Sequence, residues 1–297
     1  MSQPHLFCFG LGYTGRVLAR RLLADGWRVS GTCRSEGRAA ELRQLGITAY
    51  LFDEDRPLDD LADALEGISH LLSSVPPDTG GDPVLASHGP GLAAASIKPG
   101  WIGYLSTIGV YGDRQGEWID ESCAPRPLTA DSQRRLEAEG EWLDLGRRLG
   151  VPAHVFRLPG IYGPGGRSQI DALREGRAHR IVRARQVFNR IHVDDLATVL
   201  MASMASPGGS AVYNVCDDEP APADRVVEHA AGLMGIEPPP VVAFEDASLP
   251  PFAAHFYAEC KRVRNDRIKD ELGVTLRYPT YREGLAASLA KSGPSRL

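Results

Sequence analysis

The amino-acid sequence predicts an α/β fold built on a doubly wound parallel sheet, with a smaller lobe toward the C-terminus. Short apolar segments alternate with amphipathic helical segments over the first 160 residues, a pattern typical of a parallel sheet with crossover helices on both faces. After residue 160 the connections become rich in glycine and proline, which indicates a separate unit. We expect a nucleotide-binding domain at 1–160 and a substrate-side lobe at 161–297, with about 188–216 returning to the main sheet.

The individual elements follow from periodicity. Strands are expected at short apolar runs, which lie at 5–9, 28–33, 49–52, 70–75, 101–106, 155–158 and 211–215. Helical spacing of Val17, Leu18 and Leu22 predicts a helix directly after the first strand. A longer amphipathic helix is predicted at 131–150, where Gly150 ends it.

Composition excludes several classes of protein. The net charge is −5 and no long run of Lys and Arg occurs, which argues against nucleic acid or an anionic membrane surface as a partner. No apolar run approaches the roughly 18 residues of a membrane-spanning helix. The five cysteines are scattered, with no CxxC pair, so neither a zinc site nor a disulfide framework is indicated. We expect a cytoplasmic protein that holds no metal.

A dinucleotide fingerprint follows the first predicted strand. Residues 10–15 read Gly-Leu-Gly-Tyr-Thr-Gly and match G-x-G-x-x-G at the start of a helix. Gly10 would permit the tight turn, Gly12 the approach of the pyrophosphate and Gly15 close packing of helix on strand. We therefore predict a Rossmann-type domain in which Gly10, Gly12, Tyr13, Thr14 and Gly15 bind the cofactor.

The end of the second predicted strand bears on the choice of cofactor. An NAD site usually carries a carboxylate there, whereas this chain has Thr32-Cys33-Arg34-Ser35. Arg34 could pair with a 2′-phosphate while Thr32 and Ser35 donate hydrogen bonds, which favours NADP(H) over NAD(H). Asp53 could accept a hydrogen bond from the adenine amino group or could be an ordinary loop carboxylate. Ser74 and Thr107, after later strands, complete the expected cofactor set.

Three further segments resemble the extended short-chain dehydrogenases/reductases of the NAD-dependent epimerase/dehydratase group. They are Ser106-Thr-Ile-Gly-Val-Tyr-Gly-Asp113, Arg157-Leu-Pro-Gly-Ile-Tyr-Gly-Pro-Gly165 and Ile191-His-Val-Asp-Asp-Leu-Ala197. Together with the glycine loop they extend the likeness over nearly the whole chain. The resemblance implies an NAD(P)-dependent enzyme, and it leaves both a monomer and a homodimer paired through the 131–150 helix open.

The same resemblance suggests catalytic candidates and one departure. Thr107 occupies the position of a Ser or Thr that binds the substrate oxygen. The family's Tyr and Lys, four residues apart on the next helix, are replaced by Asp131 and Arg135. A carboxylate beside a guanidinium favours its ionised form and has no proton to donate, so this chain is identified as an atypical member. Asp131 could act as a base or bind a substrate hydroxyl, and Arg135 could hold the cofactor ribose or an anionic group of the substrate. The alternative is a surface ion pair between the two residues.

For several other polar residues, a structural role is the alternative to a functional one. Tyr111 and Tyr162 are candidates for proton transfer, with packing as the alternative for each. His192, Asp194 and Asp195 fit a structural turn and helix start better than a metal site, because adjacent Asp residues in an extended segment point to different sides. The basic residues of 261–264 could reach a substrate phosphate or form a solvated face.

The sequence is compatible with two functions. The first is an NAD(P)-dependent oxidoreductase, epimerase or dehydratase acting on a sugar nucleotide or similar polyhydroxylated small molecule. The second is a non-catalytic NADP(H)-binding redox sensor or regulator, which the loss of the catalytic tyrosine would explain.

Overall fold

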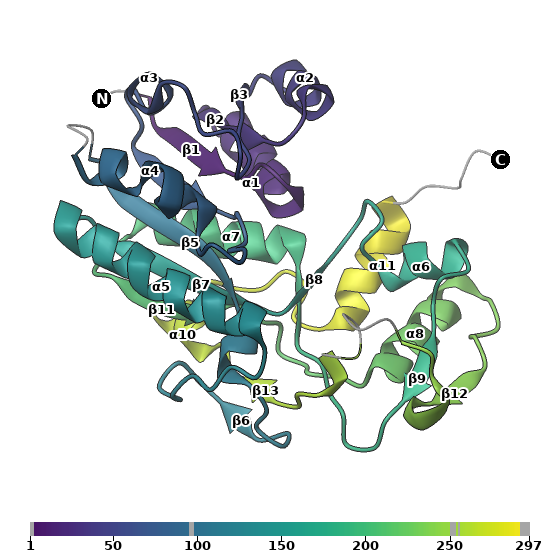
Figure 1. Ribbon diagram of the computed structural model, residues 1–297. Helices are drawn as coiled ribbons and strands as arrows, with labels where there is room; N and C mark the ends of the chain where they lie inside the picture. Colours follow the sequence, from purple (N-terminus) through teal and green to yellow (C-terminus); the bar gives the residue numbers. More distant parts are fainter. Residues whose placement is uncertain (1–2, 95–97, 250–253, 255, 292–297) are drawn as a thin grey trace. The chain divides into compact units, whose positions relative to one another are not determined.

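A computed structural model describes residues 3–94, 98–249, 254 and 256–291. The chain divides into two compact units, both drawn in Figure 1. The first unit comprises 1–110, 127–157 and 197–213, and the second comprises 111–126, 158–196 and 214–297. Among the described residues, no helix is long and apolar enough to cross a membrane.

The first unit is built on a seven-stranded sheet in the order β11-β7-β5-β4-β1-β2-β3. The pairs from β3 through β5 are parallel. The strands are β1 His5–Phe9, β2 Arg28–Cys33, β3 Thr48–Leu51, β4 His70–Ser73, β5 Trp101–Thr107, β7 Ala153–Leu158 and β11 Ala211–Asn214. The predicted Rossmann-type α/β fold is therefore confirmed, and its strands begin and end within a few residues of the predicted limits.

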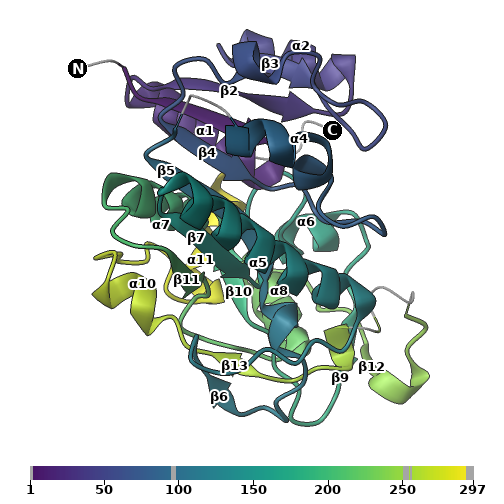
Figure 2. The same cartoon turned by 60° about the vertical axis from the view of Figure 1, so that its left-hand side comes forward.

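Helices cover both faces of this sheet. They are α1 Tyr13–Ala24, α2 Glu36–Gln44, α3 Leu61–Ala64, α4 Pro83–Ala94, α5 Ala130–Leu149 and α7 Val193–Ala205. Figures 1 and 2 show α4 and α5 on one face and α1 and α7 on the other. The core is large and partly aromatic: Tyr104 of β5 stacks on Trp142 of α5, with ring centroids 6.0 Å apart. Gly150 ends α5 in the left-handed conformation, as the sequence predicts.

A buried polar network reinforces the last strands of the sheet. The indole N–H of Trp101 donates to Ser203 Oγ over 2.9 Å, and Ser203 Oγ lies 2.6 Å from His154 Nδ1. The other ring nitrogen of His154 lies 2.8 Å from the carbonyl oxygen of Gly209. Because these polar groups are paired inside the core, their hydrogen bonds offset the cost of burying them and join β5, β7 and α7.

The second unit consists of short elements. Its strands form three parallel pairs: β8 Gly160–Tyr162 with β10 Arg190–His192, β9 Arg180–Val182 with β12 Val241–Ala243, and β6 Trp118–Ile119 with β13 Arg262–Val263. Its helices include α6 Gln169–Arg174, α8 Ala223–Met234, α10 Asp266–Asp270 and α11 Tyr281–Lys291. Side chains of α6, α8 and α11 pack around Tyr162 and form a small core of their own.

Candidate functional site

The loop between β1 and α1 has the backbone geometry of a phosphate cradle. Gly10 adopts a φ of +83°, which disfavours any residue with a side chain. The N–H of Leu11 donates to the carbonyl oxygen of Thr32, which fixes the loop against β2. Gly12 precedes the first helical residue, and neither a side-chain cap nor an acidic residue occupies the first turn of α1. The positive end of the helix dipole therefore remains available to an anion.

Close packing beneath the loop between β1 and α1 explains why position 31 is a glycine. A Cβ on Gly31 of β2 would lie 2.2 Å from the carbonyl oxygen of Cys8 in β1, a distance that real atoms do not reach. Gly15 is also confined, since its Cβ would lie 3.3 Å from the carbonyl oxygen of Gly10. The helix and two strands thus approach one another closely enough to hold the loop in one position.

Two predicted cofactor residues support the loop itself. Ser74, directly after β4, donates its hydroxyl to the carbonyl oxygen of Gly10. Thr32 is buried, and its hydroxyl oxygen accepts the N–H of Gly10 at 2.8 Å. We expected Thr32 to donate to a cofactor phosphate, but this strand position faces the core, so its side chain fixes the loop.

Arg34 lies at the end of β2 with an exposed side chain. The described residues provide no ion-pair partner for its guanidinium, although neighbouring arginines are paired, Arg38 with Glu41 and Arg56 with Asp53. Ser35 accepts the N–H of Arg38 and caps α2. In the part of the chain that the structure describes, a cation without an ion-pair partner therefore stands where an NAD site carries a carboxylate. Asp53, by contrast, is bound to Arg56, so its carboxylate already has a partner.

The carboxyl end of β5 brings two hydroxyl groups together. Thr107 Oγ1 accepts the N–H of Gly109 at 3.0 Å, and Ser132 of α5 is held by Thr129, the N-cap residue, at 3.0 Å. A Cβ on Gly109 would lie 3.3 Å from Thr107 Oγ1 and 2.7 Å from Ser132 Oγ. Sequence analysis identified Thr107 but missed Ser132, although a serine three residues after an N-capping threonine is a usable signal.

Arg135 reaches the same end of β5, whereas Asp131 does not. The guanidinium of Arg135 donates to the carbonyl oxygen of Leu105 at 2.5 Å. The Asp131 side chain is 83% exposed and pairs with Arg134, one turn away. The alternative of an ion pair between Asp131 and Arg135 is not realised, because Asp131 meets Arg134, three residues away on this helix, while Arg135 turns toward the sheet.

The tyrosine candidates are both buried in the second unit. Tyr111 ends the short helix η1 Ile108–Tyr111, and its phenol donates to Asn214 Oδ1 at 2.8 Å. Tyr162 donates weakly to the carbonyl oxygen of Thr280 at 3.4 Å, and burial raises the pKa of its phenol. Both side chains serve packing in this structure, the alternative that the sequence left open.

The remaining candidates have structural partners. Asp195 accepts the N–H groups of Arg277 and Tyr278 at 2.8 and 2.9 Å, and Asp194 pairs with Lys291 at 2.7 Å. Lys261 is buried, pairs with Glu259 and donates to the carbonyl oxygen of Gly112. These groups hold the second unit together, in agreement with a turn and helix start at 192–195.

Comparison with known proteins identifies relatives over almost the full length. A structure of a functionally unknown conserved protein from Silicibacter pomeroyi is 48% identical, covers 98% of this chain and 100% of its own, and superposes with a TM-score of 0.88. Protein YeeZ of Escherichia coli K12 is 28% identical over 281 residues, 91% of this chain and 94% of YeeZ. A 3-diazoavenalumate denitrifying reductase from a Streptomyces species is 26% identical over 300 residues, 92% and 96% of the two chains. No protein family model matches the sequence.

Further solved structures are similar to this chain over almost its full length. One from Methylobacillus flagellatus, assigned to the NAD-dependent epimerase/dehydratases, is 26% identical with a TM-score of 0.70 and covers 98% of both chains. At the level of fold alone, the chain matches UDP-glucuronic acid 4-epimerase from Bacillus cereus with NAD (16% identity, TM-score 0.75, covering 96% and 97%). It also matches the human epimerase family protein SDR39U1 with NADPH (18% identity, TM-score 0.74, covering 96% and 98%).

Proposed function

Because the chain belongs to the NAD-dependent epimerase/dehydratase group of short-chain dehydrogenases/reductases, as an atypical member, we propose that it is an NADP(H)-dependent oxidoreductase of a small organic molecule. The observation that carries this proposal is the exposed guanidinium of Arg34 at the end of β2, which has no ion-pair partner among the described residues. An Arg at this place can neutralise a 2′-phosphate, and α1 can receive the pyrophosphate.

The names of related proteins support a nicotinamide cofactor and the reaction class. Neighbours of the same fold were solved with NADPH or with NAD, and one full-length relative is a reductase. The neighbours that bind UDP-sugars share only the fold with this chain, so their substrates do not decide which molecule is converted here.

A bound nicotinamide would supply or accept the hydride, and residues of this chain would orient the substrate and move the proton. Thr107 Oγ1 accepts the N–H of Gly109, so its own proton is available to a substrate oxygen. Ser132, which faces Gly109 from α5, offers a second hydroxyl. Arg135 brings a positive charge to this end of β5, where it would stabilise negative charge that develops on the substrate oxygen.

A second candidate function is an NADP(H)-binding sensor without turnover. It is favoured by Asp131, which stands where the resemblance places a proton-donating tyrosine and whose side chain is exposed and paired with Arg134. A sensor would bind NADPH and NADP with different affinities and convert no substrate. The two functions therefore share the cofactor site and differ in turnover.

The cofactor assignment is tested by calorimetric titration with NADPH, NADP, NADH and NAD. We expect tight binding of the phosphorylated pair, weakened at least tenfold in Arg34→Ala, with little change for NADH. Arg147→Ala is the matched control, since Arg147 is an exposed arginine of the same unit at the far end of α5. Equal binding of NADH and NADPH by the wild type would refute the NADP(H) preference, and no binding would refute both functions.

A further inference from the structure

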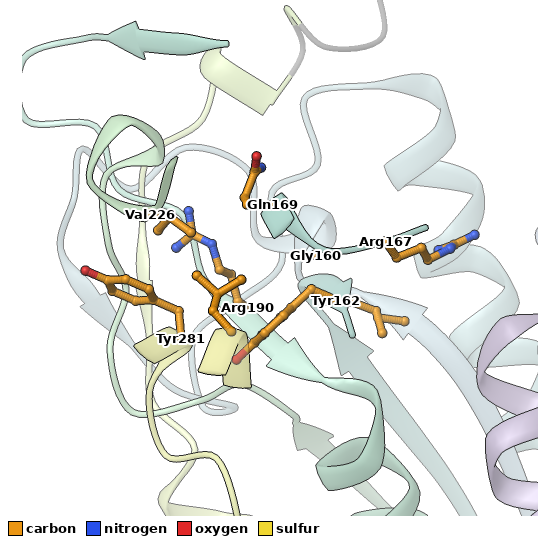
Figure 3. A pocket seen from close by; sticks show the side chains of 9 residues that line it. Gly160, Tyr162, Arg167, Gln169, Arg190, Val226 and Tyr281 are labelled. Atoms are coloured by element: carbon orange, nitrogen blue, oxygen red, sulfur yellow. The ribbon is translucent and has the colours of Figure 1, made fainter. Parts of the chain in front are cut away.

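The second unit contains a pocket of about 160 Å³ that Figure 3 shows from close by. The apolar and aromatic part of its lining consists of Ile161, Tyr162, Val226, Tyr281 and Leu285, and the polar part of Arg167, Gln169 and Arg190. A cavity of about 150 Å³ with apolar walls accepts a molecule of the size of benzene. The pocket therefore suits a small ring or a branched aliphatic group.

One cation faces this apolar space. Arg190 of β10 uses a single terminal nitrogen, Nη1, to donate to the carbonyl oxygens of Phe188 and Ala221, at 2.8 and 3.1 Å. Within the described part of the chain, no acceptor meets Nε or Nη2. Nε and Nη2 form one edge of the guanidinium. Such an edge binds a carboxylate through two parallel hydrogen bonds.

Arg190 also lacks a counter-ion. Asp217 and Glu219 act on it through space, but among the described residues no carboxylate lies within the 4.0 Å of an ion pair with it. Glu219 pairs with Arg282 instead, and burial raises the pKa of Asp217 well above its usual range, which disfavours the charged form. A cation in a largely apolar pocket is costly unless an anion joins it.

The other arginine of the pocket does not share this arrangement. Figure 3 shows the side chain of Arg167 extending away from the group around Arg190, and Arg167 is exposed whereas Arg190 is half-buried. Arg190, held through Nη1 by two backbone carbonyls, is therefore the charge that lies among the rings of Tyr162 and Tyr281.

We propose that this pocket binds a small organic acid, with its carboxylate on the Nε and Nη2 edge of Arg190 and its apolar body between Tyr162 and Tyr281. The small organic acid would be the substrate of the enzyme proposed above, so this assignment rests on that function. The volume of the pocket fits a small acid more closely than a nucleotide diphosphate sugar.

Calorimetry on the full chain with benzoate as the probe tests this inference. Benzoate should bind, and benzamide, which has the same shape without the charge, should bind at least tenfold more weakly. Phenyl phosphate distinguishes the two common anions: binding tighter than that of benzoate would overturn the carboxylate assignment. Equal binding of benzamide and benzoate would overturn the role of charge.

Two matched variants locate the site. Arg190→Lys keeps the charge but removes the two-pronged edge, and should weaken benzoate at least tenfold, whereas Arg167→Lys should change it less than twofold. The reverse order, or no loss in Arg190→Lys, would refute the proposal, and unchanged thermal unfolding of both variants without ligand excludes misfolding. NADPH titration separates the two proposals: NADPH binding without benzoate binding refutes only this inference, and the opposite result refutes only the cofactor assignment.

Discussion

Glu139 of α5 and Arg157 of β7 form an ion pair inside the first unit, with 3% and 6% of their side chains exposed. Arg157 donates from Nη2 to Glu139 Oε2 at 2.7 Å and from Nε to Oε1 at 3.1 Å. Ser106 of β5 donates to the same Oε1 at 2.6 Å. The carboxylate thus joins a helix to two neighbouring strands just before the end of β5 that carries Thr107.

Removal of one member of this pair should be costly. We expect Glu139→Ala to lower the free energy of unfolding by about 3–5 kcal/mol, because it removes the carboxylate that pairs with the buried Arg157 guanidinium. Urea unfolding of the purified variant measures the loss. The double variant Glu139→Leu with Arg157→Met should lose less than the single one, and a larger loss in the double variant would contradict this account.

The close approach of β2 to β1 predicts that a side chain at position 31 destabilises the protein. Gly31→Ala places a Cβ where the carbonyl oxygen of Cys8 lies, 2.2 Å away, so the strands must separate. We expect a loss of several kcal/mol or failure to fold, together with loss of NADPH binding. Gly37→Ala in α2 is the matched control, since its Cβ meets no atom within 4 Å. It should be neutral or stabilise the protein by up to about 1 kcal/mol.

The parts of the fold that sequence analysis predicted are those in which local pattern determines position. Strands buried on both faces read as apolar runs, and Gly10 is required by the backbone of its own turn. The site depended on contacts that no local pattern contains. Asp131 could meet Arg134 or Arg135 at equal cost on a helix surface, and only the position of β5 draws Arg135 away.

Arg190 is a clearer example of a residue whose contacts no local sequence pattern reveals. Its Nη1 acceptors are the carbonyl oxygens of Phe188, two residues away, and Ala221, 31 residues away. The resemblance singles out the neighbouring 191–197 segment, but nothing in the sequence indicates that the edge of this guanidinium faces a pocket. Whether a charge lies in a pocket, and which acceptors reach it, is a property of the folded chain, so it becomes visible only when the tertiary contacts are known.

The hydroxyl of Thr107 should matter for turnover more than for cofactor binding. With a substrate that the enzyme converts, Thr107→Val should lower kcat by roughly 10- to 1000-fold, the usual range for loss of one group that stabilises or protonates the reacting oxygen. The Kd for NADPH should change less than twofold. Ser132→Ala should give a smaller loss, since Thr107 remains.

Thr48→Val is the control for this experiment, because Thr48 is an exposed threonine of β3 in the same unit. Loss of kcat in Thr48→Val equal to that in Thr107→Val would show a general effect on stability. Unchanged kcat in the Thr107→Val and Ser132→Ala double variant would exclude both hydroxyls from the reaction.

His192 should make the second unit sensitive to mild acid. Its Nδ1 accepts the N–H of Asp194 at 3.1 Å, its ring is fully buried between Tyr162 and Tyr278, and burial lowers its pKa to about 4. The unfolded chain takes up a proton near pH 6.5 while the folded chain resists it. Stability that is present above pH 6.5 is therefore lost as the pH falls toward 4, by about 3 kcal/mol at 1.4 kcal/mol for each pH unit.

The variant His192→Asn isolates this contribution from the other histidines, because the Asn carbonyl oxygen can still accept the N–H of Asp194. Between pH 6.5 and 4 its unfolding free energy should fall less steeply than that of the wild type, by up to the same 3 kcal/mol. NMR titration of the His192 ring provides a direct check. A ring that protonates near pH 6.5 in the folded protein, or parallel pH curves for the two proteins, would show that burial does not hold this imidazole neutral.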